Sequence, residues 1–458
     1  MFLYKTVKDN PQVFIGCFMF LIYAGDATVK VFLRSFGCSS NFADGEVLAG
    51  CLKSAGFTLV NSEEDADVVI YNSCAVKGPT ENRIIDALKR VSRGRKIVVA
   101  GCLPLINFER LLREAHFDGA AGPAAGKNIV DVVNRVLKGE KVVSLDDALT
   151  VQPPLDLPRI QMNPLVSVIP VNYGCLGSCA YCCVVHARGR LRSYKISEVA
   201  ERVKRELSLG VKEFWVTSQD VACYGRDIGT NLAELLNTLS QIDGEFRIRV
   251  GMMTPNIVAP ILPQVIEAFS SPKVYKFVHL PVQSGDDGVL RKMLRFYTAE
   301  EFKELVAQFR KAFPQLTLST DVICGFPGES AEAFENTLRL LEEVKPDVVN
   351  VSKFFARPKT AAIEMKDEFV ERNEVKRRSV LAAQLAKKIA LEKNQQWLGW
   401  RGEVLVNEKG KVPHSWIGRN FAYKPITVVS EKEDLLGKTV QVKIVKAFST
   451  HLSAVITY

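Results

Sequence analysis

The chain has 458 residues, which is more than one compact core usually holds and predicts about three domains. With 47% hydrophobic and 24% charged residues, its composition excludes wholesale disorder. The net charge of +9 permits a nucleic-acid partner without requiring one.

The cysteine content favours metal binding over a disulfide framework. The count of eleven is odd, the chain is long, and several cysteines lie close together in the sequence. This pattern is typical of an intracellular protein whose thiolates bind metal. The cysteines are Cys17, Cys38, Cys51, Cys74, Cys102, Cys175, Cys179, Cys182, Cys183, Cys223 and Cys324.

The N-terminus carries an apolar run at residues 13–24 (VFIGCFMFLIYA), which is too short to span a bilayer as a helix. A signal-peptide core is one interpretation. We favour another, in which residues 1–28 are a non-native or mis-assigned extension and the protein opens near Val29. No later stretch is long and apolar enough to span a membrane, so we expect a cytoplasmic protein with no membrane partner.

Residues 29–150 alternate β-branched runs with helical stretches. The runs are VKVFLRSF (29–36), ADVVIYNS (66–73) and KIVVAG (96–101), and the helical stretches are 41–56 and 79–92. Such alternation predicts a doubly wound α/β domain with a parallel sheet.

A proline-rich linker at 150–164 precedes a second domain, which we place at 160–394. Most of its candidate strands are separated by helical stretches, and six β/α units predict a partial (β/α)6 barrel. The strands are 166–174, 213–219, 247–252, 276–284, 316–325 and 348–355.

Residues 367–396 read as a basic amphipathic helix, and residues 395–458 as a small all-β barrel. From Trp397 onward, nine Lys or Arg stand against five acids, which suits RNA phosphates. We therefore expect RNA contacts at Lys411, Arg419 and Tyr423, with Trp416 and Phe421 as further candidates. The alternative is that these aromatic rings form the core of the barrel.

Cys175, Cys179 and Cys182 follow the first strand of the second domain as C-x3-C-x2-C. Three thiolates at this spacing can hold three irons of a 4Fe–4S cluster and leave the fourth open to a ligand. The position fits, because barrel enzymes keep their active sites at the carboxyl ends of the strands.

A zinc site with His186 as fourth ligand is the alternative, and the arginine-rich loop around this histidine disfavours it. In the same loop, Arg188, Arg190 and Arg192 are expected to contact RNA phosphate, or else to be solvated charges.

Cys38, Cys74 and Cys102 each follow one of the three strands of the first domain. Because the carboxyl ends of parallel strands share one edge of a sheet, the three thiols are predicted to converge on a second, auxiliary cluster. Small buried cysteines are the alternative. We interpret the remaining cysteines after Val29 as packing or passive residues: Cys51, Cys183, Cys223 and Cys324.

Several motifs together resemble those of the MiaB-like methylthiotransferase family of radical S-adenosylmethionine (radical SAM) enzymes. SFGCSSNFADGE, NSCAVKGPTENR and GCLP are similar to its first domain, and GCLGSCAYCCVVHARGRLRSY is similar to its radical loop. TSQDVACYGRD, HLPVQSGDDGVLRKMLRFYT and DVICGFPGE resemble its barrel motifs, and GRNFAYKPITV resembles its C-terminal TRAM domain. The resemblance covers nearly the whole chain after Val29.

The resemblance implies two 4Fe–4S clusters and S-adenosylmethionine, whose cleavage yields a 5′-deoxyadenosyl radical. In the family, an aromatic residue before the last ligand packs beside the adenine, which is the place of Tyr181. Ser218, Gln219, Gln283 and Asp321 lie at strand ends facing the expected site and are candidates to bind the cofactor.

NSCAVKGPTENR and KFFARPKTAA resemble the archaeal and eukaryotic branch, which implies a tRNA substrate. That branch makes the 2-methylthio derivative of N6-threonylcarbamoyladenosine at position 37, in the anticodon stem-loop. The alternatives are isopentenyladenosine in tRNA, a small-subunit ribosomal protein, and a non-catalytic iron–sulfur protein that binds RNA. An external electron donor, a sulfur source and a monomeric chain complete the expectation.

Overall fold

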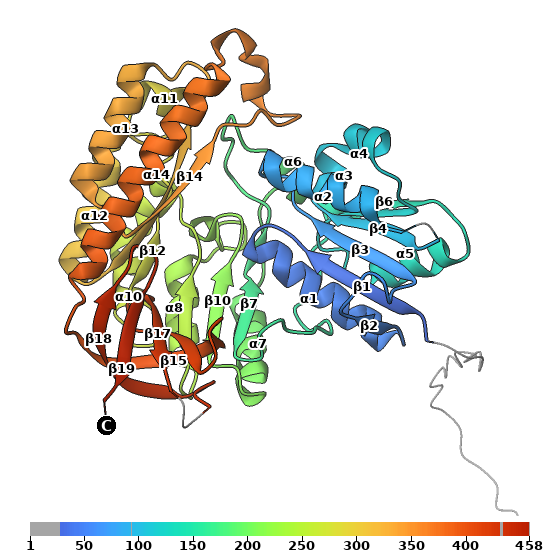
Figure 1. Ribbon diagram of the computed structural model, residues 1–458, viewed down its shortest axis with the longest axis horizontal. Helices are drawn as coiled ribbons and strands as arrows, with labels where there is room; N and C mark the ends of the chain where they lie inside the picture. Colours follow the sequence, from blue (N-terminus) through green and yellow to red (C-terminus); the bar gives the residue numbers. More distant parts are fainter. Residues whose placement is uncertain (1–27, 93, 431–433, 458) are drawn as a thin grey trace, which may run out of the picture.

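The computed structural model describes residues 28–92, 94–430 and 434–457. Figure 1 shows three domains, with the first (blue to teal) beside the second and the third (red) below the second. The interpretation of residues 1–28 as an extension lies outside the described residues, except for Thr28. No helix in the described part of the chain is long and apolar enough to cross a membrane.

The first domain is built around a six-stranded parallel sheet in the order β2-β1-β3-β4-β5-β6. Its elements are β1 (Lys30–Ser35), α1 (Ser39–Ser54), β2 (Thr58–Val60), β3 (Val68–Ser73), α2 (Gly78–Arg90), β4 (Lys96–Gly101), α3 (Leu103–Ile106), α4 (Phe108–Glu114), β5 (Gly119–Ala121), α5 (Asn128–Leu137), β6 (Val142–Ser144) and the 3-10 turn η1 (Asp146–Leu149).

Alternation along β3 gives this sheet two apolar faces. Val68 and Ile70 pack with α1 and α5, whereas Val69 and Tyr71 pack with α2, α3 and α4 on the other side. Because side chains of a strand point to opposite faces in turn, one central strand serves both layers. The predicted doubly wound α/β domain is confirmed.

The second domain carries two three-stranded parallel sheets, β11-β10-β7 and β12-β13-β14. Parallel bridges between Ile248 and Val274 and between Met252 and His279 join them into one curved, open wall. The predicted partial (β/α)6 barrel is therefore confirmed.

The elements of the second domain are β7 (Val166–Pro170), β8 (Asn172–Tyr173), α6 (Val184–Arg188), β9 (Arg192–Ser193), α7 (Ile196–Ser208), β10 (Glu213–Thr217), η2 (Val221–Cys223), α8 (Leu232–Ser240), β11 (Arg247–Val250), α9 (Pro255–Val258), η3 (Ala259–Ile261), α10 (Leu262–Phe269), β12 (Phe277–His279), α11 (Asp287–Lys292), α12 (Ala299–Ala312), β13 (Thr317–Cys324), α13 (Ala331–Val344), β14 (Val348–Lys353), η4 (Ala361–Glu364), η5 (Lys366–Glu368) and α14 (Arg372–Gln395).

The third domain is a closed five-stranded barrel in the order β15-β16-β17-β19-β18. Its strands are β15 (Arg401–Lys409), β16 (Ser415–Arg419), β17 (Pro425–Val429), β18 (Thr439–Ala447) and β19 (Leu452–Ile456). The predicted small all-β barrel is confirmed.

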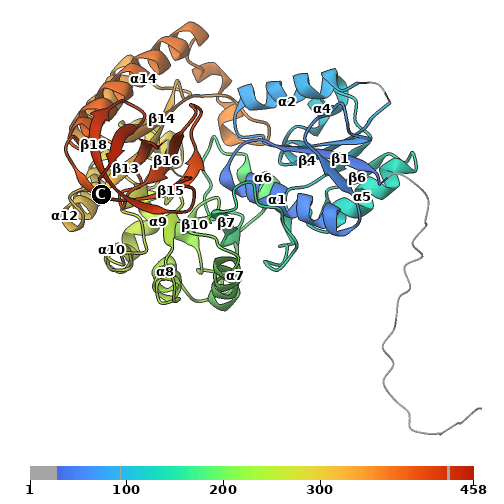
Figure 2. The same cartoon turned by 60° about the horizontal axis from the view of Figure 1, so that its bottom comes forward.

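This barrel docks at the amino ends of the central strands (Figures 1 and 2). Glu213, the first residue of β10, is fully buried and accepts hydrogen bonds from Asn407 (2.7 Å) and Tyr423 (3.2 Å). Lys424 pairs with Asp347, one residue before β14, at 2.7 Å. The third domain therefore lies at the end opposite to the cysteine loop, which follows the carboxyl end of β7.

The linker between the first two domains crosses α1 at a buried carboxyl group. The Met162 amide donates to Glu46 Oε1 at 3.1 Å, and Arg159 lies 3.5 Å from Glu206. Burial raises the pKa of Glu46 to about 7, although the Met162 hydrogen bond and the Arg159 charge oppose the rise. The folded protein thus keeps this proton at pH values where the unfolded chain, with a value near 4.5, releases it.

We predict that Glu46→Gln raises the free energy of unfolding at pH 8 by about 1–3 kcal/mol and changes it little near pH 4.5. The wild-type contribution is complete below the unfolded pKa and is lost as pH rises through about 7, because ionisation of the buried carboxyl then opposes folding. Urea unfolding at both pH values measures this difference. The exposed Glu109→Gln serves as control, and an equal loss of stability by Glu46→Gln at both pH values would contradict the prediction.

Candidate functional site

The loop between β8 and α6 brings the first cysteine triad together. The Gly177 amide donates to Cys175 Sγ at 3.2 Å, and the Cys182 amide donates to the Cys179 carbonyl at 3.0 Å. A Cβ atom added at Gly177 would lie 3.3 Å from Cys175 Sγ and 3.6 Å from Cys179 Sγ. Two of the thiols therefore flank one turn, in a loop without a bulky side chain at its centre.

Arg295 lies directly behind this triad. It is 6% exposed, and its Nη1 donates to Cys179 Sγ at 3.2 Å. Its other guanidinium nitrogens bind the Pro281 carbonyl at 3.2 Å and the Tyr297 hydroxyl at 3.1 Å. Arg295 was not among the predicted site residues, although an arginine between the apolar residues of MLRFY is a signal for a buried cation.

Two thiols of the first triad, those of Cys175 and Cys182, are poor acids as long as no metal is bound. Burial raises the pKa of Cys175 to about 11, and the nearby Asp220 charge adds to the rise. Burial raises the pKa of Cys182 further still. Because metal ligation requires thiolates, cluster binding here releases protons.

The second triad lies where three adjacent strands of the first sheet end. Cys38 follows β1, Cys74 follows β3 and Cys102 follows β4, and these strands are neighbours in the sheet. Gly37 packs against Cys74, because a Cβ atom at Gly37 would lie 2.6 Å from Cys74 Sγ. With a φ of +103°, Gly37 turns the chain so that the loop passes over this thiol.

Cys38 is exposed, whereas Cys74 and Cys102 are buried. Burial raises the pKa of Cys74 to about 11, and the Cys38 charge adds to it. Burial raises the pKa of Cys102 to about 12, and the charge of Arg188 opposes this rise. One exposed thiol (Cys38) and two buried thiols (Cys74 and Cys102) suit a cluster that lies at the surface of its domain.

Both sets of donors fit iron–sulfur ligation, since each offers three cysteine sulfur atoms. His186, the fourth ligand of the zinc alternative, is exposed on α6. Among the described residues, no group of three His, Cys, Asp or Glu side chains is arranged to hold a single metal ion.

The two triads belong to domains that are locked together by Arg188. Its Nη2 donates to Asp44 Oδ2 at 2.6 Å and to Asn41 Oδ1 at 3.3 Å, and the Tyr173 hydroxyl donates to Asp44 Oδ1 at 2.7 Å. Arg188 is 2% exposed. The prediction that it contacts RNA is wrong, because its guanidinium is buried and forms an ion pair with Asp44 between the two domains.

Further contacts cross the same interface. Ser39 Oγ, beside Cys38, lies 2.7 Å from Thr217 Oγ1 at the end of β10. The Cys183 thiol donates to the Ala75 carbonyl at 3.6 Å. These bonds tie each cysteine loop to the neighbouring domain, so that the two triads face one region between the domains.

The two other arginines of this loop, Arg190 and Arg192, differ in how free they are to contact RNA. Arg190 is exposed, whereas Arg192 donates to the carbonyls of Arg188 (3.1 Å) and Arg190 (3.0 Å) and to the linker carbonyl of Val151 (3.4 Å). Arg192 thus holds the linker in place, and RNA phosphate would have to compete with these carbonyls.

In the third domain, Tyr423 is buried between the two barrels, and the prediction that it stacks on RNA is wrong. Arg419 is half-buried, with its guanidinium 4.6 Å from the centre of the Tyr423 ring. Trp416 is buried, whereas Phe421 is 38% exposed. Lys411 is exposed, and its role in RNA binding stays a prediction.

Two predicted cofactor residues carry buried acceptors without a donor. Gln219 Oε1 and Gln283 Oε1 have no hydrogen-bond partner among the described residues. Gln283 also adopts a φ of +69°, a conformation that costs a non-glycine residue energy and is found at functional sites. An amino acid or ribose group would supply the missing donors, so these residues fit S-adenosylmethionine.

Tyr181 and Ser218 differ in how free they are to bind a cofactor. The Tyr181 ring packs edge-on against Phe326 at 6.4 Å, which leaves it half-buried. Ser218 Oγ accepts from the Asp220 amide at 3.1 Å and so already shapes the loop after β10.

Asp321 belongs to a polar group at the mouth of the barrel. It accepts from Asn350 at 2.8 Å, and His279 Nε2 lies 3.0 Å from the same oxygen. Burial raises the pKa of Asp321, but the His279 contact and charge, Asn350 and the charge of Lys77 outweigh it, so that the pKa is lowered. Neither His279 nor Asn350 was predicted to lie at the site, although His279 opens the motif HLPVQSGDDGVLRKMLRFYT.

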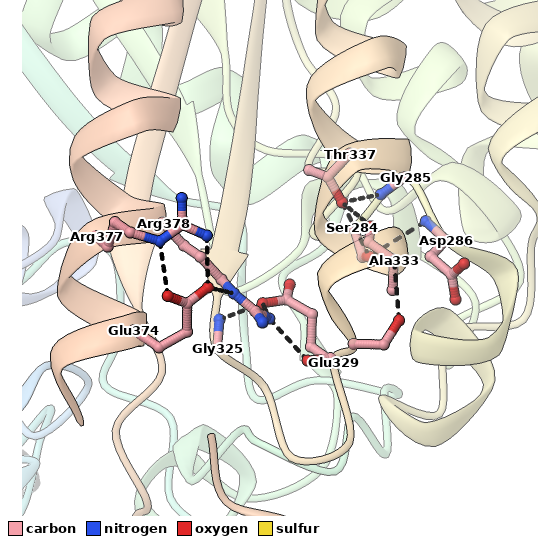
Figure 3. A network of polar contacts seen from close by, with 11 residues as sticks. Ser284, Gly285, Asp286, Gly325, Glu329, Ala333, Thr337, Glu374, Arg377 and Arg378 are labelled. Carbon is pink, nitrogen blue, oxygen red and sulfur yellow. Dashed lines mark hydrogen bonds and ion pairs between the residues drawn. The ribbon is translucent and has the colours of Figure 1, made fainter. Parts of the chain in front are cut away.

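The loops after β12 and β13 are held by a separate network, shown in Figure 3. Glu329 Oε2 accepts from the Gly325 amide at 2.7 Å and from Arg378 of α14 at 2.8 Å. Thr337 Oγ1 of α13 accepts from the Gly285 amide at 2.9 Å. These bonds fix the backbone beside Gln283 and leave the mouth of the barrel rigid.

Comparisons with known proteins agree with this arrangement. Residues 30–122 match the uncharacterized protein family UPF0004, and residues 169–341 match the radical SAM superfamily. A probable threonylcarbamoyladenosine tRNA methylthiotransferase from Pyrococcus abyssi is 43% identical over 385 residues, which cover 84% of this chain and 90% of that protein. The threonylcarbamoyladenosine tRNA methylthiotransferase of Homo sapiens is 36% identical over 424 residues, covering 91% of this chain and 72% of that protein.

Among solved structures, the radical S-adenosylmethionine methyltransferase TsrM from Kitasatospora setae, with cobalamin and a [4Fe-4S] cluster bound, matches with a TM-score of 0.52. The match covers 85% of this chain and 77% of that chain at 14% sequence identity. At this identity the match shows that the two proteins share a fold.

We predict that Arg295→Met lowers activity by about 10–100-fold while iron content is retained, since residues that bind metal ligands tune their cluster. Arg291→Met, an exposed change on the preceding helix, is the control. Turnover and iron content are measured side by side. Wild-type turnover in Arg295→Met would show that the hydrogen bond to Cys179 is without effect.

We also predict about eight irons per reconstituted chain, and about four in Cys74→Ala or Cys102→Ala. Cys183→Ala, next to a predicted ligand but with its thiol bonded to Ala75, is expected to keep the wild-type content. Iron and sulfide analysis of anaerobically reconstituted protein measures both. A wild-type value of about four would remove the second triad from the mechanism.

Proposed function

We infer that this chain, which belongs to the threonylcarbamoyladenosine tRNA methylthiotransferase family within the radical SAM superfamily, adds a methylthio group to tRNA. The base is N6-threonylcarbamoyladenosine at position 37, beside the anticodon, and the new bond forms at its C2. The cofactors are S-adenosylmethionine and two 4Fe–4S clusters, as the family implies.

The placement of the two cysteine triads is the observation that carries this proposal. Each triad follows the carboxyl ends of parallel strands, and the buried pair of Arg188 with Asp44 holds their domains together. Sulfur insertion at a carbon needs a hydrogen abstractor and a sulfur donor held near the same atom. Two clusters facing one region between rigid domains meet that requirement.

We assign Cys175, Cys179 and Cys182 to the radical SAM cluster and Cys38, Cys74 and Cys102 to the auxiliary cluster. When bound, the first cluster with S-adenosylmethionine supplies the radical chemistry, and the second holds the sulfur.

The chain's own residues orient these partners. We propose that the free acceptors Gln219 Oε1 and Gln283 Oε1 bind the polar groups of the cofactor. Tyr181 packs beside its adenine, while Asp321 and Ser218 shape the mouth of the pocket. Arg295 positions the sulfur of Cys179 and keeps a positive charge beside the cluster.

The proposal has further parts. An external reductant supplies electrons, a separate sulfur source replenishes the auxiliary site, and the chain acts as a monomer. We place the reaction in the cytoplasm, because reduced thiolates persist there.

The test is nucleoside analysis of bulk tRNA from a strain that lacks this chain. We expect the 2-methylthio form of threonylcarbamoyladenosine to disappear and the unthiolated base to accumulate. Re-expression of the wild-type chain is expected to restore the product, whereas the Cys179→Ala variant is not. Persistence of the product in the deletion strain would refute the substrate assignment, and loss of 2-methylthio-isopentenyladenosine would favour the alternative base.

A further inference from the structure

The third domain cannot hold the RNA next to the reacting base. It docks on Glu213 and Asp347, at the amino ends of the central strands, whereas both cysteine triads lie at carboxyl ends. In the loop after the first triad, Arg188 and Arg192 are occupied by protein contacts, which leaves Arg190 as the one exposed arginine of this loop. The nucleotides that flank the reacting base therefore need another surface.

The first domain has a groove that begins at the second triad. It has a volume of about 620 Å³ and runs between helix α2 and the end of β1. We call it the α2 groove. Its lining residues are Arg34, Ser35, Phe36, Gly37, Cys38, Phe42, Cys74, Val76, Lys77, Thr80, Arg83, Ala87 and Arg90.

One wall of the α2 groove is a single face of helix α2. Lys77, Thr80, Arg83, Ala87 and Arg90 recur every three or four residues, which is the spacing of one helical face. Lys77 to Arg90 spans about 20 Å at 1.5 Å per residue. The opposite wall is the turn that carries Cys38.

The groove is strongly cationic. Arg34, Lys77, Arg83 and Arg90 are exposed, and none of them forms an ion pair with a carboxylate in the described part of the chain. No Asp or Glu is among the described residues that line it. Charges left unneutralised along one wall attract a polyanion.

The length over which the cations are spread indicates whether the groove binds a polymer or a small anion. A small sulfur-bearing anion contacts one or two cations, whereas Lys77, Arg83 and Arg90 are spread along about 20 Å of helix α2. The backbone of an RNA strand carries one phosphate per nucleotide along its whole length, so a row of cations this long can contact several successive phosphates. Arg34 lies 5.2 Å from the centre of the Phe36 ring, and this aromatic floor suits unpaired bases.

One end of the groove lies at the second cysteine triad, near the mouth of the central barrel. Cys38 and Cys74 lie there, and the charge of Lys77 reaches Asp321 at the mouth of the central barrel. Phe355 of the second domain packs on Gly78, beside Lys77, so this end of the groove adjoins the second domain. A strand lying in the groove would therefore deliver its next base between the two triads.

We propose that the α2 groove binds the phosphate backbone of the tRNA strand next to the modified base. This inference rests on the proposed function, because it takes tRNA as the substrate. It places RNA recognition near the reacting atom in the first domain, and leaves to the third domain only more distant contacts.

The test measures binding of the wild-type holoenzyme and of Arg83→Gln/Arg90→Gln to threonylcarbamoyl-modified tRNA over a series of salt concentrations. We expect the double variant to bind roughly 10–100-fold more weakly at low salt, with a salt slope reduced by about two, one for each lost phosphate contact. The matched control is Lys53→Gln/Lys138→Gln, which removes the same charge from α1 and from the end of α5 on the other face of the sheet. It is expected to keep the wild-type slope.

Iron content and thermal unfolding of both double variants verify that they are folded. A wild-type affinity and slope in Arg83→Gln/Arg90→Gln would overturn the proposal, as would a raised sulfide requirement with unchanged tRNA binding, which would assign the groove to a small sulfur anion. Product formation by the wild-type enzyme is measured in the same samples. If the salt slope falls in Arg83→Gln/Arg90→Gln but the wild-type enzyme forms no product, the proposed function is refuted, whereas RNA binding by the α2 groove is supported.

Discussion

The buried ion pair of Arg188 and Asp44 is the interaction on which the arrangement of the two triads depends. Arg188 ends the short helix that follows the first triad, and Asp44 lies on the helix that follows Cys38. Removing one partner of such a pair costs about 3–5 kcal/mol in other proteins, because the other charge stays buried without compensation. Tyr173 and Asn41 add further hydrogen bonds to the pair, so that its geometry is specified as well as stabilised.

The same cation acts on the auxiliary site. The charge of Arg188 lowers the pKa of Cys74 and Cys102 and so favours their thiolate forms against the effect of burial. One side chain thus joins two domains and favours ionisation of two thiols of the second triad. Arg295 has a comparable position at the first triad. Each triad has one buried guanidinium close to its cysteines.

Much of the fold could be predicted from the sequence, because strong β-branched runs alternate with helical spacing. Elements without such a signal were missed. β5 consists of Gly119, Ala120 and Ala121, which have little strand propensity, and it forms because β4 and β6 pair with it on both sides. β16 was not predicted either. It pairs with β15 on one side and with β17 on the other.

The cysteines could be placed at neighbouring strand ends because that argument needs only strand order. Side-chain partners are a different matter, since they depend on contacts between distant segments. Arg188 and Asp44 are 144 positions apart, and Tyr423 and Glu213 are 210 apart. A charged or aromatic residue in a polar-looking segment gives no sign of such a partner, and for this reason two of the expected RNA contacts were wrong.

The helix α6 has a consequence for how the protein is made. Cys183 and Ala187, which belong to the second domain, are buried in the apolar core beneath α2 and α3 of the first. Part of the core of the first domain therefore stays uncovered until residues 183–187 have been synthesised. The segment that carries the first cysteine triad thus completes the packing of the N-terminal domain.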